Sequence, residues 1–443
     1  MNTPERNAPR NLRPAWFVPA VFLATLMANG TMAQAPAASQ EQVQRGAYLA
    51  RAGDCIACHT APKGQPYAGG LALDTPIGKV ISTNITPDPE TGIGRYSTDE
   101  FVKLMRTGVA RDGHRLYPAM PYTSYARLTQ DDLLALDAYF RQGVAPVRQP
   151  NRPTRLKWPL SMRSLMAVWN ALYLKQGEYA ANPNQNPSWN RGAYLVQGLG
   201  HCGGCHTPRG VAGQEKADSE RKGRYFLAGA TLDNWDASPL TGNPDTGLQA
   251  WSKEEIVEFL KTGRTARMAA FGAMAGVIEK STQYLTDQDL MAIAEYLKSL
   301  PASDHHKRVE TGPAIRASAA RQALRAGDTG MRGAQVYLDN CNACHHSDGT
   351  GAPRIFPNLA RNEVVNAKDP ISLVHLVLAG SATPSTQTAP SMIAMPDFGW
   401  RLSDEELADV LSFVRGNWGN HAAGVSSAEV ARIRNTLAIQ DRK

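Results

Sequence analysis

Three stretches decide how this chain folds: Cys55-Ile-Ala-Cys58-His59, Cys202-Gly-Gly-Cys205-His206 and Cys341-Asn-Ala-Cys344-His345. They repeat one motif, Cys-x-x-Cys-His, and together they contain all six cysteines of the chain. This spacing is typical of c-type haem attachment, in which two thiols bond to one haem and the adjacent histidine binds its iron. The sequence therefore predicts three covalently bound haems, which indicates electron transfer.

Two other chemistries use closely spaced cysteines, and the pattern argues against both. A redox dithiol of the thioredoxin type has no obligatory histidine after its second cysteine. A zinc site needs paired Cys-x-x-Cys knuckles that converge on one metal. Three separate copies, each with its own histidine, favour haem over these alternatives.

Length and composition indicate several small helical domains. A chain of 443 residues suits about three domains of ordinary size. Aromatic residues make up only 7% of the chain, whereas Gly and Pro number 38 and 29, which favours short helices joined by irregular backbone. The net charge is +7, but no basic stripe with interleaved aromatic residues supports nucleic-acid binding.

The N-terminus has the pattern of a secretory signal peptide. Three arginines in the first 13 residues precede an apolar stretch, Ala15 to Ala28, that is shorter than an ordinary membrane span. Ala33-Gln34-Ala35 matches an A-x-A cleavage site. We therefore expect residues 1–35 to be removed on export, with an uncleaved anchor as the alternative. The mature chain is then expected on the periplasmic side of the cytoplasmic membrane, peripherally associated with it.

Each motif lies in a repeat that opens and closes with a predicted helix. An Arg-Gly-Ala sequence stands at the start of each copy, and its glycine precedes the motif by 8 to 10 residues. The three glycines are Gly46, Gly192 and Gly333. The closing helices are expected at residues 128–140, 285–297 and 402–414. Their expected N-caps are Thr129, Thr286 and Ser403, with Asp132, Asp289 and Glu406 three residues later in the style of a capping box.

Aromatic residues of the closing helices are expected to pack where the opening helices present their glycines, because a glycine lets a ring approach the backbone closely. These aromatic residues are Tyr139, Tyr296 and Phe413. A middle helix also recurs: Ser97 and Ser252 begin capping boxes, and Gly108 and Gly263 follow the helices as C′ residues. In the third copy, Ile371 to Ala379 and then Gly380 hold the same places.

A methionine precedes each closing helix at a similar distance, and we predict that it binds the iron opposite the histidine, which raises the reduction potential. The three methionines are Met120, Met274 and Met395. Met268 and Met392 are alternatives to the second and third, but they do not keep the phase of the repeat. Five histidines are further alternatives, and none recurs across the repeats: His114, His305, His306, His346 and His375.

A ligand histidine usually donates its other ring N–H to a carbonyl, which fixes its tautomer. Pro357 is a candidate for that carbonyl in the third repeat, with a simple turn proline as the alternative. Between the first two repeats, Leu160 to Leu174 is an apolar, helix-like stretch with Arg163 and Lys175 near its edges. It is either a surface that touches lipid or a partner, or a linker helix packed between the repeats.

The chain resembles the tri-haem cytochrome c subunit of membrane-bound bacterial dehydrogenases over about residues 40 to 420. The resemblance rests on Asn84-Ile-Thr-Pro-Asp-Pro-Glu-Thr-Gly-Ile-Gly94, Leu116-Tyr-Pro-Ala-Met-Pro-Tyr122, Trp158-Pro-Leu-Ser-Met162 and Met395-Pro-Asp-Phe-Gly-Trp400. The second repeat keeps a weaker echo of the first of these stretches, Leu240-Thr-Gly-Asn-Pro-Asp-Thr-Gly247. Members of this family serve quinoprotein alcohol dehydrogenases and flavin-dependent gluconate, sorbitol and fructose dehydrogenases.

The resemblance implies a mainly α fold of three class I cytochrome c-type domains in tandem, with long irregular linkers. The expected domains are 40–142, 188–300 and 331–420, separated by linkers 143–187 and 301–330 and followed by a tail, 421–443. It also implies that a partner dehydrogenase oxidises an alcohol, sugar, sugar acid or aldehyde. This chain would then pass the electrons to membrane ubiquinone and would not be an enzyme by itself.

Three alternatives stay open at this point. The first is a soluble periplasmic shuttle that meets several partners. The second is a subunit of a molybdenum hydroxylase or aldehyde oxidase, because the same cytochrome type also occurs with those enzymes. The third is a haem enzyme of the peroxidase class, which needs an open iron site and which three matched methionines argue against.

Overall fold

Helix starts in this chain are set by capping residues that recur along the sequence. The computed structural model describes residues 38–244, 246–303 and 315–440. Ser97, Ser252 and Ser403 each form a full capping box with a glutamate three residues later, as predicted. Thr129 and Thr286 also cap their helices, but Asp132 and Asp289 do not bond back to the cap, because their carboxylates bind arginine and tyrosine side chains instead.

The first repeat and its linker hold six α-helices, one hairpin and a π-helical turn. The helices are α1 (Gln40–Ala52), α2 (Cys55–Cys58), α3 (Thr98–Thr107), α4 (Tyr122–Tyr125), α5 (Gln130–Ala138) and α6 (Leu165–Tyr173). The hairpin pairs β1 (Ala72–Thr75) with β2 (Gly78–Ile81), and the π-helical turn is η1 (Tyr139–Gly143). The predicted middle helix is α3, which ends at Gly108 in the left-handed conformation with φ of 64°.

The second and third repeats are also built of short helices and one strand pair each. The second has α7 (Pro187–Gln197), α8 (Gly203–His206), β3 (Ala230–Leu232), β4 (Trp235–Ala237), α9 (Lys253–Thr262), α10 (Gly272–Lys280), α11 (Asp287–Lys298) and two 3-10 helical turns, η2 (Glu220–Lys222) and η3 (Thr282–Tyr284). The rest has α12 (Ile315–Arg325), α13 (Ala334–Asn340), α14 (Asn342–His345), α15 (Ile371–Ala379), β5 (Ser381–Ala382), β6 (Ala394–Met395), α16 (Asp404–Gly416) and α17 (Ser427–Gln440). The strands form three two-stranded antiparallel hairpins, and the described chain is otherwise helical or irregular, so the expected mainly α class is confirmed.

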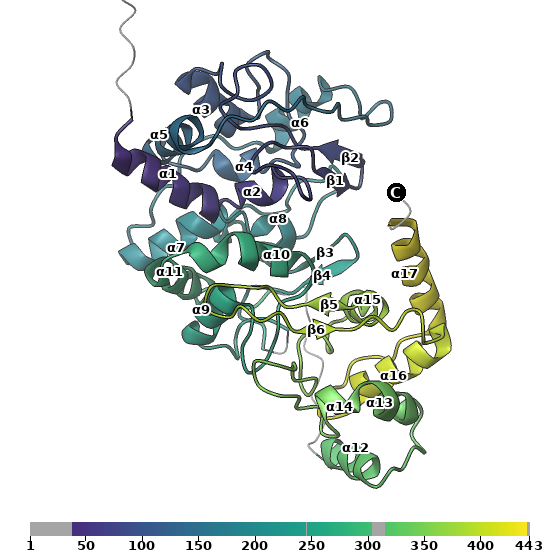
Figure 1. Cartoon of the computed structure of the whole chain (residues 1–443). Helices are drawn as coiled ribbons and strands as arrows, with labels where there is room; N and C mark the ends of the chain where they lie inside the picture. Colours follow the sequence, from purple (N-terminus) through teal and green to yellow (C-terminus); the bar gives the residue numbers. More distant parts are fainter. Residues whose placement is uncertain (1–37, 245, 304–314, 441–443) are drawn as a thin grey trace, which may run out of the picture. The chain divides into compact units, whose positions relative to one another are not determined.

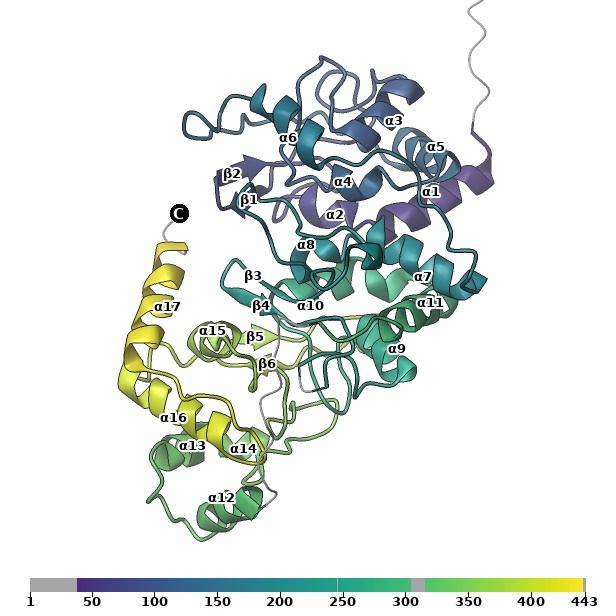
Figure 2. The same cartoon turned by 180° about the vertical axis from the view of Figure 1, so that it is seen from behind.

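Opening and closing helices lie side by side, α1 against α5 and α7 against α11 (Figures 1 and 2). Glycine makes this approach possible. A Cβ added to Gly46 would lie 1.9 Å from the Ala135 carbonyl oxygen and 2.6 Å from Cβ of Tyr139. A Cβ on Gly192 would lie 2.0 Å from the Ala292 carbonyl oxygen. Only a residue without a side chain fits at these crossings.

In the third repeat the glycine meets the same place of its closing helix. A Cβ on Gly333 would lie 2.2 Å from the carbonyl oxygen of Asp409, which corresponds to Ala135 and Ala292. Gly333 has φ of 84° at the N-cap of α13, whereas Gly46 and Gly192 lie within their helices. Phe413 packs on Tyr337 and Trp418, with ring centroids 5.7 and 5.5 Å away.

The described residues have two main cores. One core runs through the first two repeats and includes Leu49, Leu133, Leu199 and Leu290. The other belongs to the third repeat and gathers side chains of α13, α15 and α16. Buried residues of α12 and α17 also join it, so segments expected to be linker and tail contribute to this core. The first two repeats therefore share apolar packing that the third does not.

Buried Arg415 of α16 holds the segment that follows this helix by hydrogen bonds. Its guanidinium donates to the carbonyls of Val365, Ala367 and Ala423, and the residue is 1% exposed. Because burial disfavours the charged form, the pKa of Arg415 is lowered. No helix in the described ranges is long and apolar enough to cross a membrane. The expected signal peptide, His305 and His306 lie outside the described residues.

Candidate haem sites

Each Cys-x-x-Cys-His motif forms a single helical turn directly after its opening helix. These turns are α2, α8 and α14. Residues three apart lie on one face of a helix, so the two thiols of each motif project to the same side. None of the six cysteines forms a disulfide.

The three motif histidines share one hydrogen-bond pattern. Nδ1 of His59 lies 2.6 Å from the Thr83 carbonyl oxygen, and Nδ1 of His206 lies 2.7 Å from that of Ser238. Nδ1 of His345 lies 3.0 Å from the carbonyl of Pro357, which confirms the predicted partner. A carbonyl oxygen only accepts, so each Nδ1 carries the proton and each Nε2 keeps its lone pair for a metal.

Burial keeps these rings in the form that binds metal. Desolvation lowers the pKa of His59, His206 and His345, although the hydrogen bond to the carbonyl opposes it. A neutral imidazole is the ligand form of histidine. The sites therefore present three neutral imidazoles with a fixed tautomer.

The hairpins explain two carbonyl partners that the sequence analysis did not identify. Thr83 lies two residues after β2, and Ser238 lies directly after β4. Each hairpin thus returns the chain beside its motif helix, as the contact between α8 and β3 shows. Only the third repeat uses a proline, and only there did the sequence carry a visible signal.

The environment of the thiols disfavours thiolate chemistry. Burial raises the pKa of Cys55, Cys202 and Cys341 to about 12. Reactive dithiols act as thiolates and need a lowered pKa. No group of three or more His, Cys, Asp or Glu side chains in the described parts of the chain is arranged to hold a metal ion.

Two of the predicted methionines pack on the same core as their motif cysteine. Met120 and Cys55 both line the core of the first two repeats, and Met395 and Cys341 both line the third-repeat core. Met392 is 66% exposed, so the half-buried Met395 is the better placed of that pair.

Met274 lies in the first turn of α10, half-buried. The residue two before it, Gly272, meets the indole of Trp235, whose atoms would lie 2.8 Å from an added Cβ. Trp235 begins β4, which leads to the Ser238 carbonyl that holds His206. Met268 instead packs on a separate cluster around Trp251. The turn that carries Met274 therefore contacts the strand that leads to the carbonyl partner of His206.

Two histidines that were alternative iron ligands have side-chain contacts elsewhere. His114 pairs with exposed Asp112 through Nδ1. The ring of His375 stacks on Trp235, with centroids 3.8 Å apart and an interplanar angle of 19°.

In the first two repeats, a tyrosine of each repeat bonds an aspartate of the other. Tyr48 of α1 donates to Asp289 at 2.6 Å, and Tyr194 of α7 donates to Asp132 at 2.6 Å. Each hydroxyl also accepts from the backbone N–H of the threonine that caps the other repeat's closing helix, at 3.3 and 3.2 Å. Each aspartate is held within its own repeat by an arginine, Asp132 by Arg45 and Asp289 by Arg191. The contact is thus reciprocal, like one between two copies of a subunit.

This reciprocal contact places the first two motif helices near each other. Tyr125 of the first repeat donates to the Gly53 carbonyl at 3.3 Å, and its ring lies 6.1 Å from that of His201, the residue before Cys202. Helix α10 of the second repeat also contacts α2, the first motif helix. The first and second candidate sites are therefore neighbours.

The third repeat meets the second through different groups. The β3–β4 hairpin contacts α15 through the stack of Trp235 on His375 and through Ser372, which accepts from the Asp236 N–H at 2.7 Å. Glu363 accepts from Trp251 Nε1 at 2.7 Å, and burial raises its pKa to about 7. No reciprocal tyrosine–aspartate bond occurs at this junction among the hydrogen bonds of the described residues.

The residues present fit a covalently attached haem. Each motif offers two thiols on one side of a helical turn and a histidine whose Nε2 keeps its lone pair. In two repeats a half-buried thioether borders the same apolar core. These are the groups that hold and ligate c-type haem.

Comparison with known proteins agrees with this chemistry. The cytochrome c family profile matches residues 190–301 and 330–418. The chain is 48% identical over 410 residues to the gluconate 2-dehydrogenase cytochrome c subunit of Pantoea cypripedii, covering 91% of this chain and 92% of that protein. It is 48% identical over 409 residues to the cytochrome c subunit of alcohol dehydrogenase (quinone) from Gluconobacter oxydans, covering 92% and 85%. It is 38% identical over 417 residues to the fructose dehydrogenase cytochrome subunit of Gluconobacter japonicus, covering 90% and 83%.

Proposed function

The chain belongs to the family of cytochrome c subunits of gluconate, alcohol and fructose dehydrogenases, and from this premise we propose that it relays electrons through three haems from a partner dehydrogenase to ubiquinone. Members of this family carry covalent haem c and serve as electron-transfer subunits rather than as the catalytic ones. The partner oxidises an alcohol, sugar, sugar acid or aldehyde, and this chain receives the electrons one at a time.

The observation that carries the proposal is the threefold recurrence of one histidine geometry. His59, His206 and His345 each follow two cysteines on a helical turn, and each donates Nδ1–H to a backbone carbonyl. This supports three tandem cytochrome c-type domains at 40–142, 188–300 and 331–420, each with one haem. Met120, Met274 and Met395 are the proposed sixth ligands.

The protein's own contribution is to hold and shield these groups. Haem iron supplies the one-electron chemistry, because it cycles between the ferric and ferrous states. Carbonyls fix the histidine tautomers, buried side chains exclude water, and the thioethers favour the reduced form. The reciprocal tyrosine contact keeps the first two haem sites next to each other, which favours electron transfer between them.

The location follows from the predicted signal peptide. Cleavage after residue 35 would release a periplasmic protein, and delivery to ubiquinone requires contact with the membrane. The proposal therefore includes export and peripheral association with the cytoplasmic membrane.

Fractionation of the native host, together with haem counting, tests this function. We expect the mature chain in the membrane pool, released by mild detergent but not by high salt, with a dehydrogenase that co-purifies. Pyridine haemochrome analysis should give three haems per chain, and Cys341→Ala should impair attachment of one. A wholly soluble monomer that co-purifies with no dehydrogenase would contradict the proposal. Carbon monoxide binding to the reduced protein would point to an open iron site instead.

A further inference from the structure

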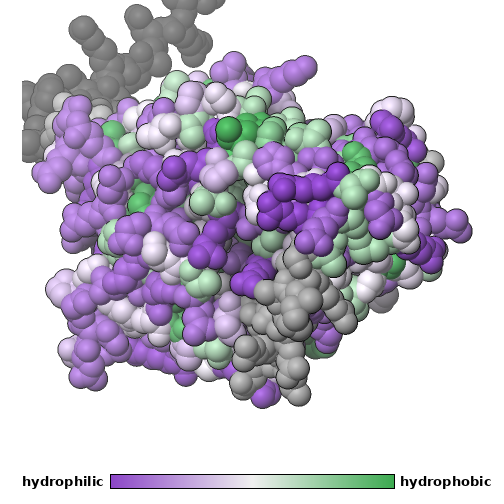
Figure 3. Space-filling model, turned by 90° about the horizontal axis from the view of Figure 1, so that it is seen from below, coloured by the Kyte–Doolittle hydropathy of each residue, from purple (hydrophilic) through white to green (hydrophobic). Residues whose placement is uncertain are grey.

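The haem sites do not account for one apolar surface of the molecule. Ten large hydrophobic side chains are exposed among the described residues, and six lie between positions 158 and 172. These six, which we call the linker surface, are Trp158, Leu160, Met162, Leu165, Val168 and Leu172. On the face shown in Figure 3, by contrast, hydrophilic residues dominate and strongly hydrophobic ones occur singly or in small groups, as is ordinary for a water-exposed surface.

Helix α6 is anchored by some of its side chains and exposes others. Trp169 donates Nε1–H to the Ala212 carbonyl at 2.9 Å, and Asn170 bonds both the Thr107 carbonyl and the Tyr122 hydroxyl. Val168 and Leu172 of the same helix are nevertheless 61% and 68% exposed. These two residues are four apart, so they lie on one face of the helix. The helix is therefore packed between the first two repeats and still presents apolar side chains outward.

The loop before α6 is held in place as well. Tyr117 donates to the Leu160 carbonyl at 3.0 Å, and Arg163 donates to the Arg115 carbonyl at 2.8 Å. The Arg163 guanidinium also lies 4.7 Å from the centre of the Tyr117 ring. Trp158, which is 78% exposed, thus stands on a fixed segment.

Positive charge is concentrated in the same segment. Residues 141–177 contain seven of the 47 Lys and Arg residues and no Asp or Glu. The remaining 40 basic residues are balanced by the 40 acidic ones. Within the segment, Arg141, Arg148 and Lys175 pair with acidic groups from other parts of the chain. The other four basic residues have no ion pair among those of the described residues. Arg152, Arg155 and Lys157 precede Trp158, and Arg163 lies between Met162 and Leu165.

We propose that the linker surface lies against an anionic membrane, with its apolar side chains at the headgroup boundary and its basic side chains on lipid phosphates. An exposed apolar helix face, a tryptophan and unpaired Lys and Arg are the combination that recognises such an interface. The inference rests on the proposed function only in placing the chain at a membrane. It identifies which surface makes the contact.

Vesicle binding of the haem-loaded chain tests the inference. Flotation with phosphatidylcholine vesicles, with and without phosphatidylglycerol, should show binding that the anionic lipid strengthens. Val168→Ser with Leu172→Ser should weaken partitioning by about tenfold or more, because both apolar side chains leave the acyl boundary. Arg155→Glu with Lys157→Glu should abolish the preference for anionic vesicles. Ile355→Ser and Lys103→Glu are matched controls on exposed positions elsewhere, and both should bind like the wild type.

The outcomes separate this inference from the function. Wild-type protein that does not bind anionic vesicles overturns it, as does serine-variant protein that binds unchanged. If the serine variant binds vesicles like the wild type but loses the co-purifying dehydrogenase, the surface belongs to a protein partner, and the inference is overturned as well. If wild-type protein binds vesicles as expected but passes no electrons to a quinone, the surface stands and the proposed function falls.

Discussion

The first two repeats are joined by matching groups, whereas the third is attached by unlike ones. Tyr48 and Tyr194 occupy the same place in their opening helices, and each bonds the aspartate of the other repeat. The third repeat has Gln335 at that place, and its side chain bonds Asp339 of its own helix. The third repeat also has Glu406 at the place of Asp132 and Asp289, and this carboxylate bonds its own cap residue, Ser403.

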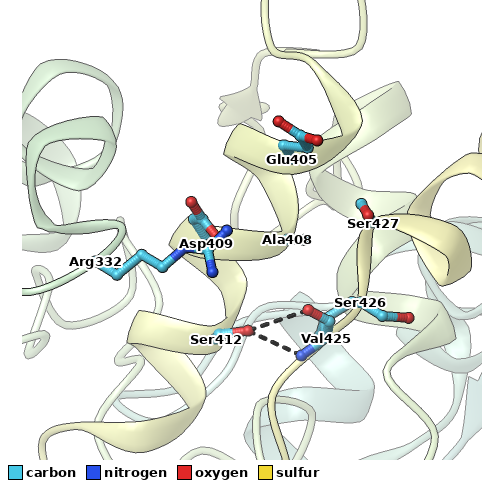
Figure 4. Close-up of a pocket in the computed structure, with 8 residues that line it drawn as sticks. All are labelled: Arg332, Glu405, Ala408, Asp409, Ser412, Val425, Ser426 and Ser427. Carbon is cyan, nitrogen blue, oxygen red and sulfur yellow. Dashed lines mark hydrogen bonds and ion pairs between the residues drawn. The ribbon is translucent and has the colours of Figure 1, made fainter.

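The corresponding face of the third repeat is an open groove (Figure 4). Arg332 pairs with Asp409 at 2.7 Å, as Arg191 does with Asp289, but Arg332 is 82% exposed and no tyrosine covers it. Ser412 bonds the backbone of Val425 across the groove. The arginine before the glycine thus pairs with an aspartate in both repeats, half-covered in the second and solvated in the third, although Asp409 lies at the place of Ala292 and not of Asp289.

The largest effect is expected where helices cross at glycine. Gly192→Ala should lower the free energy of unfolding by about 3 kcal/mol or more, because the new Cβ would lie 2.0 Å from a backbone oxygen. It should disturb the first and second haems together, since their repeats share one core. Gly333→Ala should disturb only the third haem. Gly276→Ala, where a Cβ meets nothing within 4 Å, serves as the control. Denaturant unfolding followed at each haem is the measurement.

The second-largest effect is expected at Asp132 and Asp289, the aspartates that bond a tyrosine of the other repeat. Asp289→Ala should cost about 2–3 kcal/mol, because it removes bonds from Arg191 and Tyr48 to a carboxylate that is 6% exposed. Asp409→Ala, at the solvated pair of the third repeat, should leave the unfolding midpoint unchanged. Equal losses in both variants, measured by urea unfolding, would remove the distinction between the two faces.

The reciprocally bonded tyrosines should give a smaller, pH-dependent effect. Tyr48→Phe should cost about 1 kcal/mol at pH 8, the usual net value of one hydrogen bond. Burial and the bond to Asp289 raise the pKa of Tyr48 above its ordinary 10.0. Its stabilising effect is therefore present below pH 10 and lost as the pH rises through the folded-state pKa. The gap between wild type and Tyr48→Phe should shrink as the pH is raised beyond 10. A constant gap in urea titrations across that range would contradict this assignment.

The stabilisation by this interface should also be lost at acid pH. Burial opposes ionisation of Asp289, but its bonds from Arg191 and Tyr48 outweigh burial and lower its pKa below the ordinary 3.8. The stabilisation is therefore present above the unfolded-state pKa and is lost as the pH falls through the folded value. Asp289→Asn protein should converge with wild type only in that acid range.

The smallest effect is expected at the junction with the third repeat. Arg354 pairs with Glu258 across it, but Arg354 is 67% exposed. Exposed ion pairs contribute little, so Arg354→Ala should leave both stability and haem potentials as in the wild type. A clear loss of stability in thermal melts would show that this junction depends on charge rather than on the packing of Trp235 and His375.

Much of each repeat was predictable because it depends on local rules. Ser97, Ser252 and Ser403 begin helices as their sequence pattern indicates, and Gly46 and Gly192 lie where aromatic residues of the closing helices approach. Pro357 was identifiable because the carbonyl it supplies lies in a distinctive turn.

Other features depend on contacts between distant segments. The carbonyls of Thr83 and Ser238 reach their histidines only because hairpins fold back, and nothing in the side chains marks them. The reciprocal bonds of Tyr48 and Tyr194 have one visible trace in the sequence. Two repeats have a tyrosine at the same position, and the third has Gln335 there. Helices α12 and α17 carry no motif, and their place in a core follows from tertiary packing.

The central claim is that three units each hold one haem between a histidine and a methionine. Spectroelectrochemical titration of the wild type and of Met120→Leu, Met274→Leu and Met395→Leu tests it most directly. We expect three one-electron steps in the wild type. Each variant should keep its haem, lower the potential of one step and weaken the far-red Met-to-iron absorption. Variants that shift all three steps together, or that shift none, would contradict it.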